Sequence, residues 1–384
     1  MRLLITTAGD IDQEFGGGQV YTRNLVSAQS EAGHEVEAVG NRTAIQSAIV
    51  QARPDLVHAH GWKAVAARAA EEYGVPCIVT MHHGGLLCPG GALLDRGDRI
   101  CRRAAEQRFC TACCLRGRWW GNAPPGIGRL LRRLPNIPFV TPAMTTPLGV
   151  NDKLTDISSL RRDVTLFVAP SAAVQDALIQ NGVPLERIAV VHHGIKPLQY
   201  RPINRSSTIR FAYVGRICHV KGFHVLVEAM KRLRGNCELH VIGAAHSKWE
   251  KRYLGRMAIP ECVIFHGHLI GESLAETWAK CHVTVLPSVY LEVFGLVIPE
   301  SFSLGRPVIV TDSGGPSELV RSGVDGFIVP PNDAEALAAA MQRFVDGPEL
   351  VSKMASRLPH VRTMREHVAD LEKIYAGCGT MREK

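Results

Sequence analysis

The fold is constrained most by a regular alternation of short apolar segments with amphipathic ones. In the first half of the chain, the expected strands lie at 2–7, 34–39, 55–59, 76–80, 164–169 and 187–192. In the second half they lie at 208–214, 237–242, 261–265, 282–286, 306–311 and 325–329. Short apolar strands that alternate with amphipathic helices indicate parallel sheets covered by helices on both faces. The sequence therefore predicts an α/β protein built from two doubly wound, Rossmann-like domains.

The length of the chain agrees with two domains, because 384 residues exceed one ordinary hydrophobic core. We place the first domain at 1–195 and the second at 208–360. The stretch 196–207 is polar and contains proline, which is typical of a linker. Residues 361–384 are expected to form a C-terminal helix that packs back on the first domain. We expect the two domains to face each other across a cleft.

Composition favours a globular protein of the cytoplasm. Hydrophobic residues make up 46% of the chain and charged residues 21%, and no apolar run reaches the length of a membrane span. The first residues lack the apolar core of a signal peptide. Eleven cysteines, an odd number spread over a large chain, fit a reducing compartment better than a disulfide framework.

Positive charge is concentrated in one region. The formal net charge is +8, and residues 96–133 alone hold ten arginines against Asp98 and Glu106. Such a local patch favours an anionic partner at one place and argues against general nucleic-acid binding. The patch lies within 84–150, a stretch that breaks the alternation of strands and helices and holds clustered Gly, Pro, Cys and Arg. An irregular insertion of this length is typically functional or disordered.

This insertion also carries a hint of membrane contact. Residues 127–134 place apolar and basic side chains at helical spacing, and Trp119 and Trp120 are suited to a bilayer interface. A peripheral position at the inner face of a membrane is one interpretation. A solvated basic loop whose apolar residues pack on the domain is the other.

Two carboxylates, Glu292 and Glu300, are the leading candidates for a ligand site. Glu292 follows the expected strand 282–286, and Glu300 lies on the helix that the same loop opens. In an open α/β sheet, ligands bind at the carboxyl ends of the strands. Free backbone N–H groups at the helix start, around Phe294, Gly295 and Leu296, can donate hydrogen bonds to a phosphate, and carboxylates can accept them from hydroxyl groups. The pattern indicates a sugar-nucleotide site, although two glutamates capping a surface helix would give the same spacing.

Further candidates follow other expected strands. Arg216 and Lys221 flank a loop that opens a helix, where two cations can neutralise a diphosphate. Gly16 and Gly17 allow close approach of the backbone to a ligand, without the spacing of a dinucleotide fingerprint. His82 follows the expected strand 76–80 at its carboxyl end and could bind a hydroxyl or assist proton movement.

Several other polar residues are interpreted without a ligand. His34, His58 and His60 flank strands, and we interpret them as packing or capping groups. Asp10 and Asp12 form a D-x-D pattern in the glycine loop, and a solvated loop is favoured there over a metal site.

The cysteines of the insertion offer a possible structural site. Cys88, Cys101, Cys110 and Cys113 could bind zinc, and the last two have the C-x2-C spacing. Cys88 and Cys101 lack such a pair, so free thiols or another pairing of the thiols stay open as the alternative.

Taken together, these residues resemble the retaining glycosyltransferases of family 4, which have the GT-B fold. The resemblance covers nearly the whole chain and depends on the order and spacing of its motifs. They are Gly16-Gly17, Ala32-Gly-His-Glu-Val36, Arg53-Pro-Asp-Leu-Val-His58, Thr80-Met-His82, Val168-Ala-Pro-Ser171, Val214-Gly-Arg216 with Lys221-Gly222, Glu292 with Glu300, and Gly314-Gly-Pro-Ser-Glu318. The family often has a larger apolar residue at the position of Gly18, so the shape of the glycine loop is expected to differ.

The resemblance implies a role for each candidate. Glu292 resembles the acid that contacts the donor sugar, and Glu300 the one that holds the ribose. Arg216 and Lys221 resemble the pair that grips the diphosphate. His82 resembles the histidine near the reacting sugar, and Gly17 the glycine that approaches the donor phosphate.

The implied function is transfer of a sugar from a nucleoside diphosphate to a hydroxyl acceptor in glycan or polysaccharide synthesis. The family keeps the anomeric configuration and requires no metal or other cofactor for catalysis. The acceptor could be lipid-linked or an acidic glycan. The alternatives are another enzyme of this fold, such as a nucleotide-sugar epimerase or a phosphorylase, and a non-catalytic module that binds anions or nucleic acid.

Overall fold

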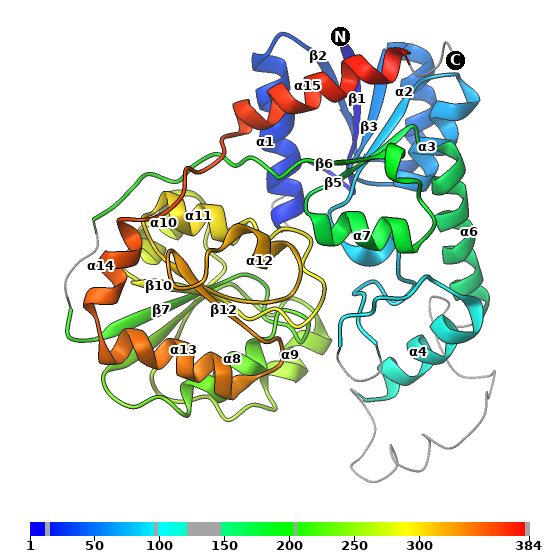
Figure 1. Ribbon diagram of the computed structural model, residues 1–384. Coiled ribbons are helices and arrows are strands. Elements are labelled where there is room, and N and C mark those ends of the chain that lie inside the picture. Colours follow the sequence, from blue (N-terminus) through cyan, green and yellow to red (C-terminus); the bar gives the residue numbers. More distant parts are fainter. Residues whose placement is uncertain (12–15, 96–98, 121–146, 203–205, 381–384) are drawn as a thin grey trace. The chain divides into compact units, whose positions relative to one another are not determined.

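The computed structural model describes residues 1–384 except 12–15, 96–98, 121–146, 203–205 and 381–384, and it describes only the backbone at 115–120, 147–149 and 379–380. The chain divides into two compact units (Figure 1). The first contains residues 1–191 together with 368–384, and the second contains residues 192–367.

The first unit is a six-stranded parallel sheet with the strand order β2-β1-β3-β4-β5-β6. Its strands are β1 Arg2–Thr6, β2 Glu35–Val39, β3 Leu56–Ala59, β4 Cys77–Thr80, β5 Leu166–Ala169 and β6 Ile188–Val190. Its helices before the C-terminal one are α1 Gly17–Glu31, α2 Ile45–Ala52, α3 Lys63–Glu72, α4 Gln107–Trp120, α6 Pro147–Asp163 and α7 Ala172–Gln180. The strands β3, β4 and β5 are buried at every position, as expected for parallel strands covered on both faces.

The second unit repeats this plan with the strand order β12-β11-β10-β7-β8-β9. Its strands are β7 Ile209–Val214, β8 Cys237–Ile242, β9 Val263–Gly267, β10 Val283–Leu286, β11 Val308–Thr311 and β12 Gly326–Val329. Its helices are α8 Phe223–Met230, α9 Lys248–Leu254, α10 Gly271–Ala279, α11 Val297–Ser303, α12 Gly315–Leu319, α13 Ala334–Asp346 and α14 Glu349–Ala355.

Neighbouring residues of β7 show how helices cover the two faces of the second sheet. Tyr213 packs against Phe223 of α8, and Ala212 packs in a cluster with Trp278 of α10. Figure 1 accordingly shows α8 and α13 on one side of this sheet and α10 and α11 on the other. The two doubly wound parallel sheets predicted from the sequence are thus confirmed.

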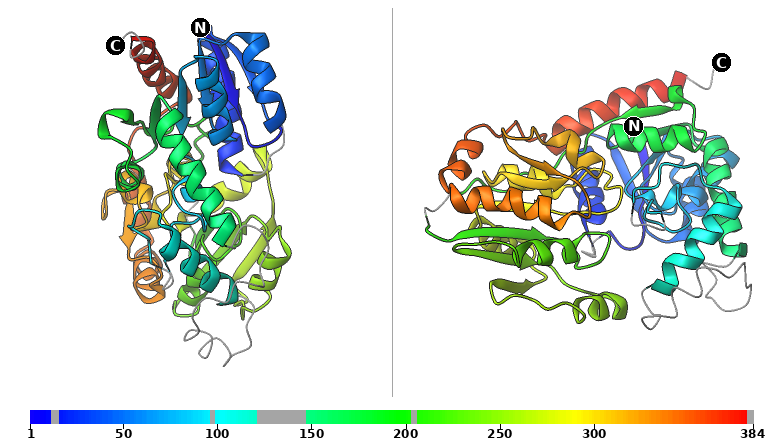
Figure 2. Two further views of the ribbon diagram at one scale, coloured as in Figure 1. Left: turned by 90° about the vertical axis from the view of Figure 1, so that its right-hand side faces the viewer. Right: turned by 60° about the horizontal axis from the view of Figure 1, so that its bottom comes forward.

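The insertion is more regular than its composition predicts. Apart from the basic segment at 127–134, the sequence indicated no helix between residue 84 and residue 150, yet α4 lies there and α6 begins at its end. Figure 2 shows α4 and α6 side by side, and Cys110 and Cys114 of α4 pack on Val150 of α6. These thiols therefore serve as small apolar residues in a local core. The predicted basic helical segment at 127–134 lies outside the described residues.

The last helix, α15 Met364–Thr380, packs on the first unit through one tyrosine. The buried Tyr375 hydroxyl accepts a hydrogen bond from Gln29 Nε2 at 2.7 Å and lies 2.8 Å from His58 Nδ1. His58 is itself buried, and its Nε2 lies 2.7 Å from Thr80 Oγ1. A chain of buried polar groups therefore connects α15 with β3 and β4.

The second unit has a structural hub in Arg306, which is fully buried. Its guanidinium donates to the carbonyl oxygens of Cys281, Ala279 and Leu304, and to those of Arg201 and Pro202. Carbonyl oxygens thus satisfy a buried cation that would otherwise be costly. Arg201 and Pro202 lie in the stretch predicted as linker, so this part of the stretch is fixed to the second unit.

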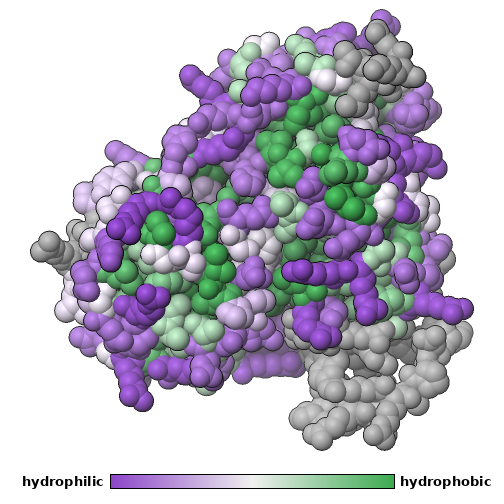
Figure 3. Space-filling view, viewed as in Figure 1, coloured by the Kyte–Doolittle hydropathy of each residue, from purple (hydrophilic) through white to green (hydrophobic). Residues whose placement is uncertain are grey.

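Hydrophobic side chains gather in Figure 3 on the face of the first unit where β6 and α7 lie. Exposed Ile179, Leu185 and Val190 belong to this region, and β6 is the edge strand of its sheet. In the described part of the chain, no helix is long and apolar enough to cross a membrane.

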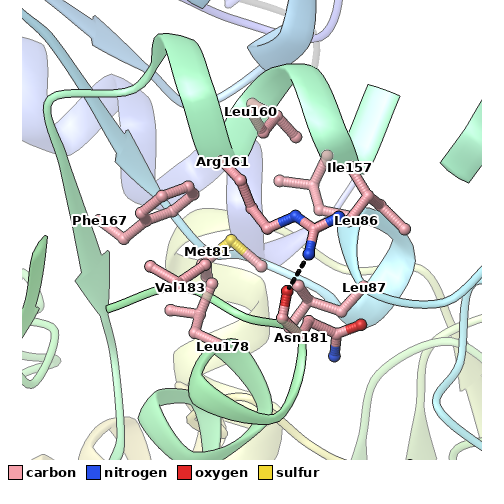
Figure 4. Close-up of a pocket in the computed structure, with 10 residues that line it drawn as sticks. All are labelled: Met81, Leu86, Leu87, Ile157, Leu160, Arg161, Phe167, Leu178, Asn181 and Val183. Atoms are coloured by element: carbon pink, nitrogen blue, oxygen red, sulfur yellow. Dashed lines mark hydrogen bonds between the residues drawn. The ribbon is translucent and has the colours of Figure 1, made fainter. Parts of the chain in front are cut away.

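A small cavity in the first unit lies between the start of the insertion, α6 and α7 (Figure 4). Its volume is about 10 Å³, which leaves room for one water molecule at most. Arg161 Nη1 crosses it to donate to Asn181 O at 3.1 Å, and Asn181 Oδ1 accepts from the Ala105 backbone at 3.0 Å. These contacts fasten the insertion to α7, so the cavity is a packing defect and no substrate site.

Candidate active site

The loop that follows β10 holds Glu292 in place through its backbone. Glu292 N donates to Ser313 O at 2.8 Å, and Gly315 N donates to Glu292 O at 2.9 Å. This parallel bridge joins the loop to the start of α12. A Cβ at Gly315 would lie 2.6 Å from Val293 O, so glycine is required for the close approach. Backbone hydrogen bonds to the start of α12 therefore fix the position of Glu292 at the carboxyl edge of the sheet.

Three side chains hold the Glu292 carboxylate. Lys221 Nζ lies 2.6 Å from Oε2, Ser288 Oγ donates to Oε2 at 2.9 Å, and the Tyr290 hydroxyl donates to Oε1 at 3.0 Å. Glu292 is only 5% exposed. A buried carboxylate is costly unless it is paired and hydrogen-bonded, and this one is both.

Lys221 reaches Glu292 because its turn packs on the end of β10. Val289 N donates to Val220 O at 3.0 Å, and a Cβ at Gly222 would lie 1.8 Å from Pro287 O. Gly222 also has a φ of 70°, which glycine adopts without strain. Desolvation alone would lower the pKa of Lys221, but Glu292 and Tyr290 raise it above its ordinary value. The lysine is therefore a permanent cation at neutral pH.

Arg216 lies in the same loop and has a different partner. Its Nε is 3.0 Å from Glu250 Oε1 on α9, and its side chain is 57% exposed. Tyr213 donates its hydroxyl hydrogen bond to Arg216 O at 2.7 Å and so fixes the backbone of the loop. The second unit thus carries two cations at one loop: Lys221 is largely buried against Glu292, and Arg216 is mostly exposed.

Glu300 occupies the first turns of α11, beyond the turn formed by Phe294, Gly295 and Leu296. Gly295 has a φ of 86°, and a Cβ there would come within 3.0 Å of Leu286. Phe294 is buried against His193, with ring centroids 5.0 Å apart. Desolvation raises the pKa of Glu300 to about 7, so near neutrality this carboxyl titrates.

In the first unit, the glycine loop and His82 lie together. Gly16 has a φ of 120° and precedes α1, whose first residues are Gly17 and Gly18. A Cβ at Gly18 would lie 3.9 Å from His82 Cβ, and the rings of Tyr21 and His82 are 5.0 Å apart. His82 Nε2 lies 2.7 Å from His60 Nδ1. The carboxyl ends of β1, β3 and β4 thus meet at one edge.

The structure places the candidates in two groups. Glu292, Lys221, Arg216 and Glu300 lie at the carboxyl edge of the second sheet. Gly16, Gly17 and His82 lie at the carboxyl edge of the first. Each group combines fixed polar side chains with close backbone approach, which suits an anionic, hydroxyl-rich ligand.

The cysteines of the insertion lie near one another. A Cβ at Gly90 would lie 3.6 Å from Cys88 Sγ and 3.8 Å from Cys114 Sγ. Burial raises the pKa of the Cys114 thiol to about 12, and Cys113 Sγ lies 3.7 Å from Leu94 O. Among the described residues, no group of three or more His, Cys, Asp or Glu side chains is arranged to hold a metal ion. The zinc site of Cys88, Cys101, Cys110 and Cys113 stays a prediction.

Sequence reasoning missed several side-chain contacts of the candidates. Ser288 and Tyr290 precede Glu292 at intervals of two residues, and this period could have indicated that all three share one side of an extended segment. Glu250 and its cap Ser247 gave a helix-start signal but no hint of Arg216. His60, interpreted as a packing or capping group, is buried beside the rings of Tyr21 and His58 and also lies within hydrogen-bonding distance of His82.

Comparison with known proteins agrees with this fold. The model of the family described as "Glycosyl transferases group 1" matches residues 201–359, and that of the "Glycosyl transferase 4-like domain" matches residues 42–117. The chain is 29% identical over 333 residues to a D-inositol 3-phosphate glycosyltransferase of Streptomyces griseus, which covers 79% of the chain and 62% of that relative. It is 27% identical to a glycogen synthase of Mycobacterium tuberculosis, which covers 70% of the chain and 68% of the relative. The match to the Streptomyces protein thus spans less than two thirds of that protein's length.

Solved structures show the same architecture along the whole chain. Anabaena HepE in complex with UDP and glucose matches with a TM-score of 0.68 at 18% identity, covering 98% of this chain and 100% of that one. Sucrose-phosphate synthase of Thermosynechococcus elongatus matches with a TM-score of 0.67 at 18% identity, covering 100% and 98%. The fold is thus that of the GT-B glycosyltransferases. One family model matches a segment of each unit, and both models describe glycosyltransferase domains, to which the chain is similar.

Proposed function

We propose that this protein transfers a sugar from a nucleoside diphosphate to a hydroxyl acceptor in glycan or polysaccharide synthesis. The observation that carries the proposal is the Lys221–Glu292 pair, fixed by Ser288 and Tyr290 at the carboxyl edge of the second sheet. It joins a cation for phosphate to a carboxylate for sugar hydroxyls within one rigid group. Its place matches the edge at which open α/β sheets bind ligands.

The donor is proposed to be a nucleoside-diphosphate sugar, and UDP-glucose is the first to test. Solved structures of HepE contain UDP with glucose, and UDP-glucose. In this chain, Arg216 and Lys221 would take the diphosphate, Glu300 the ribose and Glu292 the sugar. Gly16 and Gly17 would approach the phosphate through their backbone.

The reaction is proposed to retain the anomeric configuration and to need no metal. The bond between the anomeric carbon and the diphosphate oxygen breaks, and the acceptor oxygen forms its bond on the same face. The acceptor proton passes to the departing phosphate, whose charge Arg216 and Lys221 stabilise. His82 would contact the reacting sugar.

The acceptor is proposed to be anionic, either lipid-linked or an acidic glycan, with peripheral membrane contact through the insertion. The ten arginines at 96–133 support an anionic acceptor, because they concentrate positive charge in this region. Among those whose side chains are described, Arg103 lies over the Phe109 ring at 4.9 Å and Arg99 pairs with Asp95 at 3.1 Å. Such surface cations attract anions at low salt and lose this attraction as salt rises.

The proposal is tested first by a thermal-shift screen against UDP-, GDP- and ADP-sugars, since a ligand of the folded state raises the melting temperature. The selected donor is then incubated with glycan acceptors. We expect release of nucleoside diphosphate only when an acceptor is present. NMR of the product should show that the transferred sugar keeps the anomeric configuration of the donor. Isomerisation of the donor sugar would instead show an epimerase, and release of sugar phosphate a phosphorylase. Duplex binding without any donor binding would show a nucleic-acid module.

A further inference from the structure

The carboxylate of Glu250 is fixed by its own helix. Glu250 Oε2 accepts from the backbone N–H groups of His246 at 2.8 Å and Ser247 at 2.9 Å. Ser247 Oγ in turn accepts from Glu250 N at 3.2 Å, which completes a capping box at the start of α9. Such reciprocal bonds satisfy the orphan donors of the helix start and restrict the glutamate to one rotamer.

The other oxygen, Oε1, points to Arg216 and lies 3.0 Å from its Nε. The two loops that carry these residues are bound together: Ile217 N donates to Ala244 O at 3.1 Å, and a Cβ at Gly243 would lie 1.9 Å from Gly215 O. Glu250 is 13% exposed, whereas Arg216 is 57% exposed. A largely buried carboxylate, bound by two backbone N–H groups, therefore holds an arginine whose side chain is mostly exposed.

Glu250 is charged when it does this. Desolvation alone would raise its pKa, but the backbone donors of Ser247 and His246, together with Arg216, lower it below the ordinary value. The hold uses one carboxylate oxygen and the Nε edge of the guanidinium. The Cys218 side chain also makes a hydrogen bond with the guanidinium. An arginine has five N–H donors in a planar fork, so donors remain for a second anion.

We propose that Glu250 is a positioning residue for the donor diphosphate, which it serves by fixing the guanidinium of Arg216 through Nε. This inference rests on the role of Arg216 in the proposed function. A long exposed side chain loses rotamer freedom when it binds an anion, and a side chain that is already ordered loses less. Glu250 therefore strengthens diphosphate binding although both groups are negative.

The opposite effect is the alternative, because a carboxylate near a diphosphate also repels it. The geometry favours positioning. A carboxylate that competed with the diphosphate for the Arg216 guanidinium would bind it with both oxygens in a bidentate pair. In Glu250, Oε2 instead accepts hydrogen bonds from two backbone N–H groups. The two roles predict opposite signs for removal of the charge.

The test uses Glu250→Gln, which keeps an oxygen for the backbone donors and removes the charge. The probe is inorganic pyrophosphate, titrated by calorimetry into the full chain and its variants. We expect Glu250→Gln to weaken pyrophosphate binding about three- to tenfold. In an Arg216→Ala background the same change should have no effect, because Glu250 acts through Arg216. The Arg216 Nε–H proton should also exchange faster by NMR in Glu250→Gln.

Ser247→Ala is the matched control, because it removes the helix cap but keeps the pair with Arg216. Its pyrophosphate affinity should stay within about twofold of wild type. Tighter binding by Glu250→Gln would overturn the proposal in favour of repulsion. Equal losses with and without Arg216 would overturn it in favour of a purely structural role. The calorimetry measures pyrophosphate binding and requires no sugar transfer. The effect of Glu250 through Arg216 can therefore be present even if the protein transfers no sugar. Failure of the transfer assay and failure of the positioning role are thus separate outcomes.

Discussion

Lys221 Nζ lies 2.6 Å from Glu292 Oε2, so the proposed phosphate cation and the proposed sugar carboxylate form one ion pair in the second unit. Both side chains are largely buried, and Tyr290 contacts both: its hydroxyl donates to Glu292, and its ring centroid is 5.3 Å from Lys221 Nζ. A buried pair gives little net stability, but loss of one partner is costly. The pair is therefore better explained by ligand binding, for which its side chains are already fixed in position, than by a contribution to stability.

Glu292→Gln should lower turnover while the fold stays intact. A charged hydrogen bond to a sugar hydroxyl contributes about 1.5–3 kcal/mol, which is roughly ten- to hundredfold in kcat if it is felt in the transition state. The measurement is turnover at saturating donor, with circular dichroism as the check on folding. Glu228→Gln, an exposed glutamate of α8 in the same unit, serves as the control. Turnover of the Glu292 variant close to wild type would remove Glu292 from the site.

Lys221→Met and Arg216→Ala should weaken binding of a nucleoside diphosphate more than binding of the bare nucleoside, as measured by calorimetry. Their effects on stability should differ. Lys221→Met leaves Glu292 as a buried charge without its cation, so we expect a loss of about 1–3 kcal/mol. Arg216 is mostly exposed, so its loss should cost less than about 1 kcal/mol. Equal losses of affinity for the two ligands would show that neither residue holds the phosphates.

Arg306→Met should destabilise the second unit by about 3 kcal/mol or more, because five carbonyl oxygens would lose their buried donor. Arg306→Lys should recover part of this loss, since an ammonium has three donors and no planar fork. Hydrogen exchange of β10 and β11 is the readout, as a chain of two units need not unfold in one step. The control is Arg232→Met, a change at an exposed arginine that follows α8, and it should leave hydrogen exchange unchanged. A wild-type exchange pattern in Arg306→Met would contradict the structural role of Arg306.

The sequence predicted the parallel sheets because buried parallel strands give continuous apolar runs, as in Cys77–Thr80 and Val308–Thr311. Its placement of Glu292, Glu300 and Lys221 after strands agrees with the structure, and their roles in binding stay predictions. It failed at α4, where the thiols of Cys110 and Cys114 supply apolar contacts, and at α6, although Val150, Leu154 and Ile157 recur there at helical spacing. The pairing of Arg216 with Glu250 joins positions 34 residues apart, and only the side-by-side loops after β7 and β8 reveal it.

Near pH 7, donor binding should release protons from Glu300. Desolvation raises its pKa in the free protein to about 7, so about half of the carboxyls are protonated at neutral pH. If ribose hydroxyls donate to this group, they favour the charged form and lower its pKa in the complex. Up to about 0.5 proton per site should then be released at pH 7, and affinity should rise as pH increases through 7 and level off above it.

Calorimetry of nucleoside diphosphate binding in buffers of different ionisation enthalpy measures this release. Glu300→Gln should abolish the proton release that comes from the Glu300 carboxyl. Proton release from the phosphate of the ligand should remain. The same shift has a consequence for stability without ligand. The folded pKa of about 7 lies above the unfolded value near 4.5, so burial destabilises the charged form. Wild type and Glu300→Gln should therefore be equally stable below pH 4.5, and the variant should gain up to about 3 kcal/mol over wild type as pH rises through 7. A proton release identical in wild type and variant would show that Glu300 does not contact the ribose.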